Sequence, residues 1–404
     1  MNGSPPPSRR RAYSAIFLTV LLDLIGFGMI LPLLPFYAQE LHATPFRIGL
    51  LFASYSLAQL LFAPLLGRLS DRAGRRPVLL VTIAGSAAAH LLFALAGSYW
   101  LLLLARSLSG VAAANYGIAQ AYLADITPPE GRSRAMGVIG AAFGLGFVIG
   151  PAVGGLLSHL LGHIAVPLSA AGLSLLNLVL AAVWLSESLS PEVRGRDRSG
   201  AGTHWFGFGS LRHLGANAPL LRLMLLFFLV MFCFSIMEST LALYCQDRFG
   251  FDAARTSYLF AFVGIVLVIV QGGLLGRLVQ RFGERRLILS GIALMAAGLA
   301  LLPSSPAPAW LLGALALLAV GNGVHNPSTL GLLSQLADEG AQGETIGLSR
   351  SFGALARFLG PIAGTALFER TGAPSPFWSA GALMLIALIL AWDLLRRLPA
   401  SKMA

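Results

Sequence analysis

Residues 67–77 read Gly-Arg-Leu-Ser-Asp-Arg-Ala-Gly-Arg-Arg-Pro and separate two long apolar runs. The pattern Gly-Arg-Leu, followed by an arginine and a glycine, recurs at residues 276–283, an offset of 209 positions. Two further matches have nearly the same offset, at 210 and 207 positions: residues 150–154 with 360–364, and residues 36–40 with 243–247. Three matches in one register predict a chain built from two related halves in parallel orientation.

The composition indicates a membrane protein. Of the 404 residues, 56% are hydrophobic and only 11% are charged, and the mean hydropathy is +0.77. Soluble proteins carry about 25% charged residues, so this chain has too few charges to cover a water-facing surface. The basic residues that give a net charge of +11 stand in short clusters between apolar runs, a pattern that does not fit a nucleic-acid binder. Cys233 and Cys245 lie in or near one apolar run, and we expect no disulfide framework.

We expect twelve transmembrane helices, because a helix that spans a bilayer needs about 20 mostly apolar residues. In the first half the apolar runs fall at residues 13–38, 46–66, 77–97, 100–124, 135–157 and 164–186. In the second half they fall at residues 220–244, 256–276, 287–303, 310–335, 346–368 and 377–395. The predicted organisation is a tail at 1–12, a six-helix half at 13–186, a linker at 187–217, a six-helix half at 218–395 and a tail at 396–404.

The arginines predict the orientation of the chain in the membrane. If the N-terminus is inside, 22 of the 28 Lys and Arg residues fall in inner segments, and two, Arg106 and Arg357, fall within helices. The remaining four fall in outer segments: Arg47, Arg248, Arg255 and Arg370. Cytoplasmic loops carry the excess of basic residues. We therefore expect the linker and both tails to lie in the cytoplasm.

The segment at 67–77 resembles the signature loop of the major facilitator superfamily. The whole chain resembles that family's drug:proton antiporter branch, which includes the tetracycline exporters. Residues 146–155 resemble a segment rich in glycine and proline that marks antiporters in this family; its residues are Gly146, Gly150, Pro151, Gly154 and Gly155. Small residues let helices approach closely, and proline interrupts the hydrogen-bond ladder of a helix.

The resemblance implies a cytoplasmic gate at the signature loop. Its residues are Gly67, Asp71, Arg72, Gly74, Arg75, Arg76 and Asp125. Arg75 is expected to pair with Asp125, and Asp71 to meet the positive N-terminal end of the helix that begins near residue 346. A loop that only sets topology would explain the arginines, but it would not explain Asp71 or the spacing of the glycines.

One departure from the family bears on the substrate. The resemblance places Ala89 and Met295 where tetracycline exporters carry carboxylates, in the third and ninth helices. Neither of these predicted helices contains an acid. The departure leaves the fold and the branch unchanged, and it weighs against tetracycline as the substrate.

Four ionisable side chains lie near the middle of predicted helices: Asp23, Arg106, Glu238 and Arg357. Each costs about 2.5–3.5 kcal/mol at a helix centre, and such residues usually face a cavity or pair with one another. Glu238 lies in a small polar cluster, and we expect it to bind and release a proton during transport, with a structural ion pair as the alternative. For Asp23, proton coupling and a structural role stay equally open. We expect Glu238 and Arg357 to pair; if they do not, Arg357 can bind an anion.

Other polar side chains on the predicted helices are candidates to line a substrate cavity together with Arg106 and Arg357: Gln59, Asn115, Tyr116, Gln120, Gln271, Asn322, His325 and Asn326. Each can instead form a hydrogen bond between helices. His159 and His163 have a metal-binding spacing but no third ligand, and we expect no metal site. The chain has no ATPase-type phosphate-binding loop and no hydrolase nucleophile motif. We expect no enzyme activity and no cofactor, and the driving force is expected to be a proton gradient.

These observations predict a proton-coupled exporter of small amphiphilic or organic compounds that works by alternating access. It is expected to act as a monomer in the inner membrane of a bacterium, with a small-molecule substrate and the lipid bilayer as its partners. Two alternatives remain open. The chain could be a facilitator or symporter of a small organic anion, with Arg106 and Arg357 as counter-ions, or a membrane receptor on the same fold that transports nothing.

Overall fold

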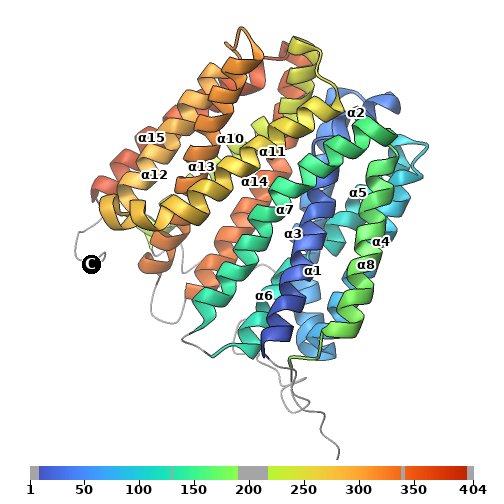
Figure 1. Ribbon diagram of the computed structural model, residues 1–404. Helices are drawn as coiled ribbons and strands as arrows, with labels where there is room; N and C mark the ends of the chain where they lie inside the picture. Colours follow the sequence, from blue (N-terminus) through green and yellow to red (C-terminus); the bar gives the residue numbers. More distant parts are fainter. Residues whose placement is uncertain (1–8, 129–130, 190–216, 338–341, 398–404) are drawn as a thin grey trace, which may run out of the picture. The chain divides into compact units, whose positions relative to one another are not determined.

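The computed structural model describes residues 9–128, 131–189, 217–337 and 342–397, and nearly all of them are helical (Figure 1). The helices described in the first half are α1 (Arg9–Ile30), α2 (Leu34–Glu40), α3 (Pro45–Ala73), α4 (Arg75–Ala94), α5 (Tyr99–Ala112), α6 (Asn115–Ile126), α7 (Arg132–Leu161) and α8 (Ala165–Trp184). Those described in the second half are α10 (Ala218–Phe249), α11 (Ala253–Ile269), the π-helical η2 (Val270–Leu274), α12 (Leu275–Leu301), α13 (Pro308–Leu336), α14 (Gln342–Thr371) and α15 (Ser375–Arg397). The predicted linker and the two predicted tails lie largely outside the described residues.

Eleven described helical segments are long and apolar enough to cross a bilayer. Many of their large apolar side chains face outward: Trp100, Leu161, Val183 and Ile389 are 71%, 69%, 73% and 68% exposed. Exposed apolar surface costs about 25 cal/mol per Å² in water, whereas in lipid the surroundings are equally apolar. The predicted fold class, a polytopic helical membrane protein, is confirmed.

One of the eleven segments, Ala253–Leu301, covers both helices predicted at 256–276 and 287–303. Within it, Gly283 has φ 74° and ψ 159°, a non-helical backbone that separates two helical stretches. The sequence predicts a loop of about ten residues between 276 and 287, but the structure has a turn at Gly283 only, so the predicted loop is too long. A single glycine is enough to turn the chain, because it reaches a positive φ that other residues avoid.

Two other predicted helices are interrupted. The run predicted at 13–38 forms α1 and α2, which are separated by a turn at residues 31–33. Pro32 explains this turn, since proline lacks an N–H and restricts the residue before it. The run predicted at 100–124 forms α5 and α6, which meet at Ala113. Gln59 Nε2 donates a hydrogen bond to the Ala113 carbonyl oxygen at 3.2 Å and so satisfies an acceptor at the break.

The described residues fall into two compact units. Unit 1 takes in the described residues of Met1–His42, Leu57–Arg198 and Ala253–Ala261, and unit 2 those of Ala43–Ser56, Ser199–Asp252 and Phe262–Ala404. The beginning of α3 therefore belongs to unit 2, and the beginning of α11 belongs to unit 1. The sequence repeat divides the chain at the linker 187–217, and so places the beginning of α3 in the first half and the beginning of α11 in the second half. This division into two sequence halves remains a proposal.

The two units repeat the same helix packing. α7 and α14 each have 30 residues, and their bounds are 210 positions apart. α1 packs on α7, and α10 packs on α14 (Figure 1). Gly150 lies against Gly28 in the first pair, and Gly360 lies against Ser235 in the second. These contacts show that α1 and α10 correspond at an offset of 207 positions.

Candidate transport site

Asp23 lies on α1 in unit 1 and is bound by two asparagines. Asn115 of α6 donates a hydrogen bond through Nδ2 to one carboxylate oxygen, and Asn177 of α8 donates to the other at 3.2 Å. Asn177 Nδ2 also donates to the Thr19 carbonyl oxygen at 3.1 Å. Asn115 and Asn177 are 7% and 0% exposed. Three helices thus converge on one carboxyl group, and their amide donors satisfy both of its oxygens.

Sequence reasoning identified Asp23 and Asn115 but missed Asn177. A signal was present, because Asn177 is the one asparagine in the apolar run of α8. Polar side chains in such runs usually hydrogen-bond to another helix, but the run itself does not indicate which helix.

A second buried polar cluster in unit 1 is formed by residues of α4, α5 and α8. His90 Nδ1 is 3.1 Å from Ser174 Oγ, and the His90 ring interacts electrostatically with Arg106. His90 and Arg106 are 6% and 2% exposed. We predicted that Arg106 lines the substrate cavity, and the structure corrects this: the side chain is almost fully buried beside His90. His90 and Ser174 were missed by the sequence reasoning.

Unit 2 carries Glu238 on α10 and Arg357 on α14. The two side chains interact electrostatically, but within the described part of the chain they form no direct ion pair. Glu238 is half-buried and Arg357 is exposed. The predicted pairing of Glu238 with Arg357 therefore stays a prediction, and the Arg357 guanidinium has N–H donors for a further partner.

Tyr55 on α3 also interacts with Arg357 and was missed by the sequence reasoning. Tyr55 and Gln59 are four residues apart on an apolar helix and so lie on one face of it. This spacing was a usable signal for a polar face. The structure assigns the two residues to different units, since the division of α3 falls after Ser56.

The remaining predicted cavity residues differ in their accessibility. The Tyr116 ring lies 6.5 Å from the Phe143 ring centroid, and Gln120 is half-buried. Gln271 is exposed within η2, and Asn326 is half-buried on α13. Asn322 is 7% exposed, and its Oδ1 has no hydrogen-bond partner among the described residues.

His325 lies in helix packing, which corrects its prediction as a cavity residue. Its side chain is 0% exposed. A Cβ at Gly291 of α12 would lie only 2.8 Å from the His325 Cβ, so the glycine makes room for the histidine between α12 and α13. The Thr329 hydroxyl is the nearest polar side chain, at 3.4 Å from Nδ1.

The loop at 67–77 forms a network around Arg75, the first residue of α4. The guanidinium contacts Asp71 Oδ1 at 2.6 Å, Asp125 Oδ2 at 3.1 Å and Ser70 Oγ at 2.6 Å. The predicted Arg75–Asp125 pair is therefore present, and it links α4 to α6. The two side chains are only 6% and 18% exposed, so this pair is better shielded from water than a surface ion pair. The predicted contact between Asp71 and the helix near residue 346 joins the two units and stays a prediction.

Glu187 caps the N-terminus of α4. Its Oε1 accepts a hydrogen bond from the Arg75 N–H at 2.9 Å, and its Oε2 accepts one from the Arg76 N–H at 3.3 Å. A carboxylate at this end of a helix satisfies free N–H groups and interacts favourably with the helix dipole. Gly74 has φ 107°, and a Cβ there would clash with the Glu187 carboxylate. Sequence reasoning placed Glu187 in the linker and missed it, because no local pattern connects it with α4.

The other predicted gate residues have simpler surroundings. The Gly67 carbonyl oxygen accepts a hydrogen bond from the Ser70 hydroxyl at 2.7 Å, and Arg72 is exposed. Arg76 donates from a terminal nitrogen to the Ala182 carbonyl oxygen at 2.7 Å. This bond ties the start of α4 to the end of α8.

The glycine motif of α7 is a packing face. A Cβ at Gly146 would lie 2.5 Å from the Leu24 Cβ, and a Cβ at Gly154 would lie 2.8 Å from the Met29 carbonyl oxygen. Gly155 faces the beginning of α11, where a Cβ would lie 2.9 Å from the Ser257 Cβ. Pro151 stands inside α7 without ending the helix. Small residues therefore bring α7 into backbone contact with its neighbours.

No group of three or more His, Cys, Asp and Glu side chains is placed to hold a metal ion in the part of the chain that the structure describes. His163 Nδ1 is 2.9 Å from Ser158 Oγ, and its Nε2 is 3.8 Å from Glu40.

Comparison with known proteins identifies the family. Residues 16–275 and 272–403 match the sequence pattern of the Major Facilitator Superfamily. The chain belongs to the major facilitator superfamily. This superfamily transporter is 32% identical over 383 residues to the class C tetracycline resistance protein of Escherichia coli, with 94% of this chain and 95% of that protein covered. It is 33% identical over 372 residues to the class G tetracycline resistance protein of Vibrio anguillarum, with 91% and 93% covered.

A solved structure is also similar to the superfamily transporter. The crystal structure of the human organic anion transporter MFSD10 matches it with a TM-score of 0.70 and 27% identity, over 96% of this chain and 100% of that chain. The predicted resemblance to a drug exporter of this superfamily is confirmed. Ala89 of α4 and Met295 of α12, where the sequence predicts departures from the tetracycline exporters, are both 0% exposed and lie in helix packing.

Proposed function

We propose that this superfamily transporter exports small amphiphilic or organic compounds in exchange for protons. It acts as a monomer in the inner membrane of a bacterium, with both ends in the cytoplasm. One observation carries the proposal: each unit has a carboxyl group on a spanning helix, Asp23 in unit 1 and Glu238 in unit 2. The similarity to bacterial tetracycline resistance proteins supports export of a drug-like compound.

The two acids are not required by the packing that the units share. At the offset of 207 positions, Asp23 corresponds to Val230, and Glu238 corresponds to Leu31. The same helix packing is therefore made with apolar side chains at the matching positions. A carboxyl group in a spanning helix costs free energy, and its presence at two unrelated positions supports a role in coupling.

The proposal is tested by flux into proteoliposomes with an acidic lumen and an alkaline bath. Tetracycline, the cation ethidium and the anion fluorescein serve as probes. We expect at least one probe to accumulate in the acidic lumen, because protons leaving through the transporter drive the probe inward. A protonophore should remove the accumulation, and protein-free liposomes under the same gradient correct for passive trapping.

The other outcomes contradict the proposal in different ways. Entry that equilibrates at the same rate with and without the gradient indicates a facilitator. No protein-dependent flux of any probe, for a protein that elutes as a single folded species, indicates a receptor.

A second candidate is transport of organic anions, and Arg357 favours it. Its guanidinium is exposed, has no direct ion pair among the described residues and cannot lose its charge. The similarity to the human organic anion transporter supports this candidate. Arg357→Ala should then abolish fluorescein transport and leave ethidium transport within about twofold, with Arg370→Ala, an exposed arginine on the same helix, as the control. Equal loss for both probes would exclude an anion site.

A further inference from the structure

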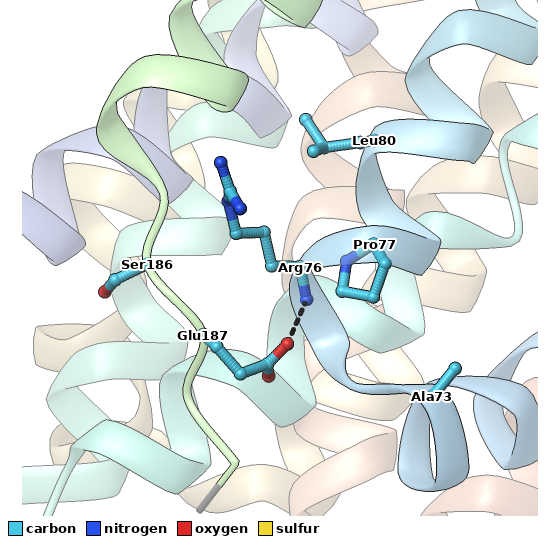
Figure 2. A pocket seen from close by; sticks show the side chains of 6 residues that line it. All are labelled: Ala73, Arg76, Pro77, Leu80, Ser186 and Glu187. Atoms are coloured by element: carbon cyan, nitrogen blue, oxygen red, sulfur yellow. Dashed lines mark hydrogen bonds between the residues drawn. The ribbon is translucent and has the colours of Figure 1, made fainter.

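A pocket of about 320 Å³ lies at the start of α4 in unit 1 (Figure 2). The residues that line it are Ala73, Arg76, Pro77, Leu80, Ser186 and Glu187. They come from the end of α3, the first turns of α4 and the chain just after α8. Figure 2 shows the Arg76 side chain in the space between α4 and the segment that carries Ser186 and Glu187. The proposed transport mechanism makes no use of this pocket.

The negative charge in the pocket is already satisfied by the protein. Besides the N–H groups of Arg75 and Arg76, Glu187 Oε1 accepts hydrogen bonds from the N–H groups of Ser188 and Leu189, at 3.0 and 3.1 Å. Four backbone donors and the positive end of α4 thus surround one carboxylate. This arrangement reduces its repulsion of an anion in the pocket.

The positive charge in the pocket is only partly satisfied. A guanidinium has five N–H donors. Arg76 uses one terminal nitrogen on the Ala182 carbonyl oxygen, and its other terminal nitrogen has no partner among the described residues. The unmet requirement in this pocket is therefore for an acceptor oxygen, and an anionic one suits arginine best.

We propose that the pocket binds the phosphate group of a membrane phospholipid, with Arg76 as the recognising cation. Arginine binds phosphate oxygens through its planar fork of donors, and basic pockets between helices at the cytoplasmic side of a membrane bind lipid headgroups. Ala73, Pro77 and Leu80 give the pocket an apolar wall that suits the lipid glycerol. The volume is about ten times the 30 Å³ that one water occupies in the liquid, which is enough for a phosphate ester.

The sequence repeat does not account for the pocket. At offsets of 209 and 210 positions, Phe282 stands in place of Ala73, and Arg397 stands in place of Glu187. The Arg281 guanidinium lies over the Phe282 ring, 5.5 Å from the ring centroid. A phenylalanine at position 73 is therefore a natural choice to fill the pocket without changing any charge.

The test measures lipid binding to the delipidated, detergent-purified transporter by native mass spectrometry. The probes are dihexanoyl phosphatidylglycerol and inorganic phosphate. We expect the lipid to bind the wild type, and Arg76→Gln to weaken that binding at least tenfold. Arg68→Gln removes the same charge from an exposed position on α3 outside the pocket lining and should change binding less than twofold. Ala73→Phe should weaken binding as strongly as Arg76→Gln.

Each remaining result overturns part of the proposal. Wild-type affinity in both Arg76→Gln and Ala73→Phe shows that the lipid binds elsewhere. If inorganic phosphate binds as tightly as the lipid and is lost with Arg76, the ligand is the free anion and the lipid assignment is wrong. If Arg76→Gln fails to fold, Ala73→Phe decides alone, because it keeps the hydrogen bonds of Arg76.

Discussion

Unit 1 and unit 2 share their helix packing but differ in how they hold charge. In unit 1, Asp23 is enclosed by Asn115 and Asn177. At the corresponding positions unit 2 has Val230, His325 and Ala387. In unit 2 the charged groups are Glu238 and Arg357, which are half-buried and exposed. Their counterparts in unit 1 are Leu31 and Phe147.

This comparison shows that the small residues at the helix contacts recur in both units, whereas the ionisable side chains do not. Glycines and small residues set the approach of α1 to α7 and of α10 to α14, and they recur in both units. The ionisable groups do not recur, so each unit can specialise. The Asp23 carboxyl group accepts a hydrogen bond at each oxygen, which suits a structural role. Among the described residues Glu238 makes no direct hydrogen bond or ion pair, although it interacts electrostatically with Arg357, and it can therefore exchange a proton. We therefore expect coupling to depend chiefly on unit 2.

The turn before α4 and the turn at Gly283 within α12 show the same contrast. Gly74 and Gly283 have the same backbone conformation, with φ 107° and 74°. Glu284 stands at the position of Arg75, and Arg397 stands at that of Glu187, so both charges are reversed. The turn is shared, but among the described residues a carboxylate caps the helical stretch after Gly74 and none caps the stretch after Gly283.

The largest expected effect is that of Glu238→Gln. Glutamine keeps the size of the side chain and resembles the protonated acid but cannot release a proton, so accumulation driven by a pH gradient should disappear. Proteoliposome flux measures it, and Asp247→Asn, an exposed acid on the same helix, is the control and should retain accumulation. A Glu238→Gln protein that still concentrates the probe would show that this acid is dispensable for coupling.

Asp23→Val gives unit 1 the residue that unit 2 has at this position and should lower stability. Two buried amides lose their acceptor, at about 1–3 kcal/mol each. Thermal unfolding in detergent measures the loss, and Asp23→Asn should lose less because an amide oxygen still accepts. Adding Asn177→Ala to Asp23→Val should recover part of the loss, since one unsatisfied amide is removed. Purely additive effects of the two substitutions would argue against this hydrogen-bond cluster.

Gly74→Ala should destabilise the protein more than Gly283→Ala. Both positions have a backbone conformation that is almost confined to glycine, which costs other residues about 1–3 kcal/mol. At Gly74 the added Cβ also clashes with Glu187, whereas at Gly283 no atom lies within 4 Å of it. Thermal unfolding compares the two variants, and in a Glu187→Ala background their difference should shrink. Equal losses in the wild-type background would show that the cap contributes nothing.

The smallest expected effect is that of Asp71→Asn, which removes a charge that is absent at the counterpart Gln280. Asp71 is 57% exposed, so its ion pair with Arg75 is worth about 0–1 kcal/mol. Even that bias shifts a nearly balanced equilibrium between conformations. Spin-label distances between the end of α3 that carries Asp71 and the start of α14 should move toward a population that is open on this side. An unchanged distance distribution would remove Asp71 from the gate.

The sequence by itself determined the membrane-spanning class, the repeat and the family. Apolar runs of about 20 residues have one stable solution in a bilayer, because every backbone N–H and C=O must be satisfied within the segment. It also predicted the Arg75–Asp125 pair, through the resemblance of the loop. Its helix limits were wrong where Gly283 turned the chain and where Pro32 interrupted it.

Only the tertiary structure decided which polar groups meet. Asn177 reaches Asp23 across 154 positions, and Glu187 caps a helix that begins 112 positions earlier. It also separated buried from accessible candidates, since Arg106 and His325 are enclosed while Arg357 is exposed. The physical reason is that spacing along a helix specifies a face of that helix, whereas the neighbour of that face depends on how all the helices pack.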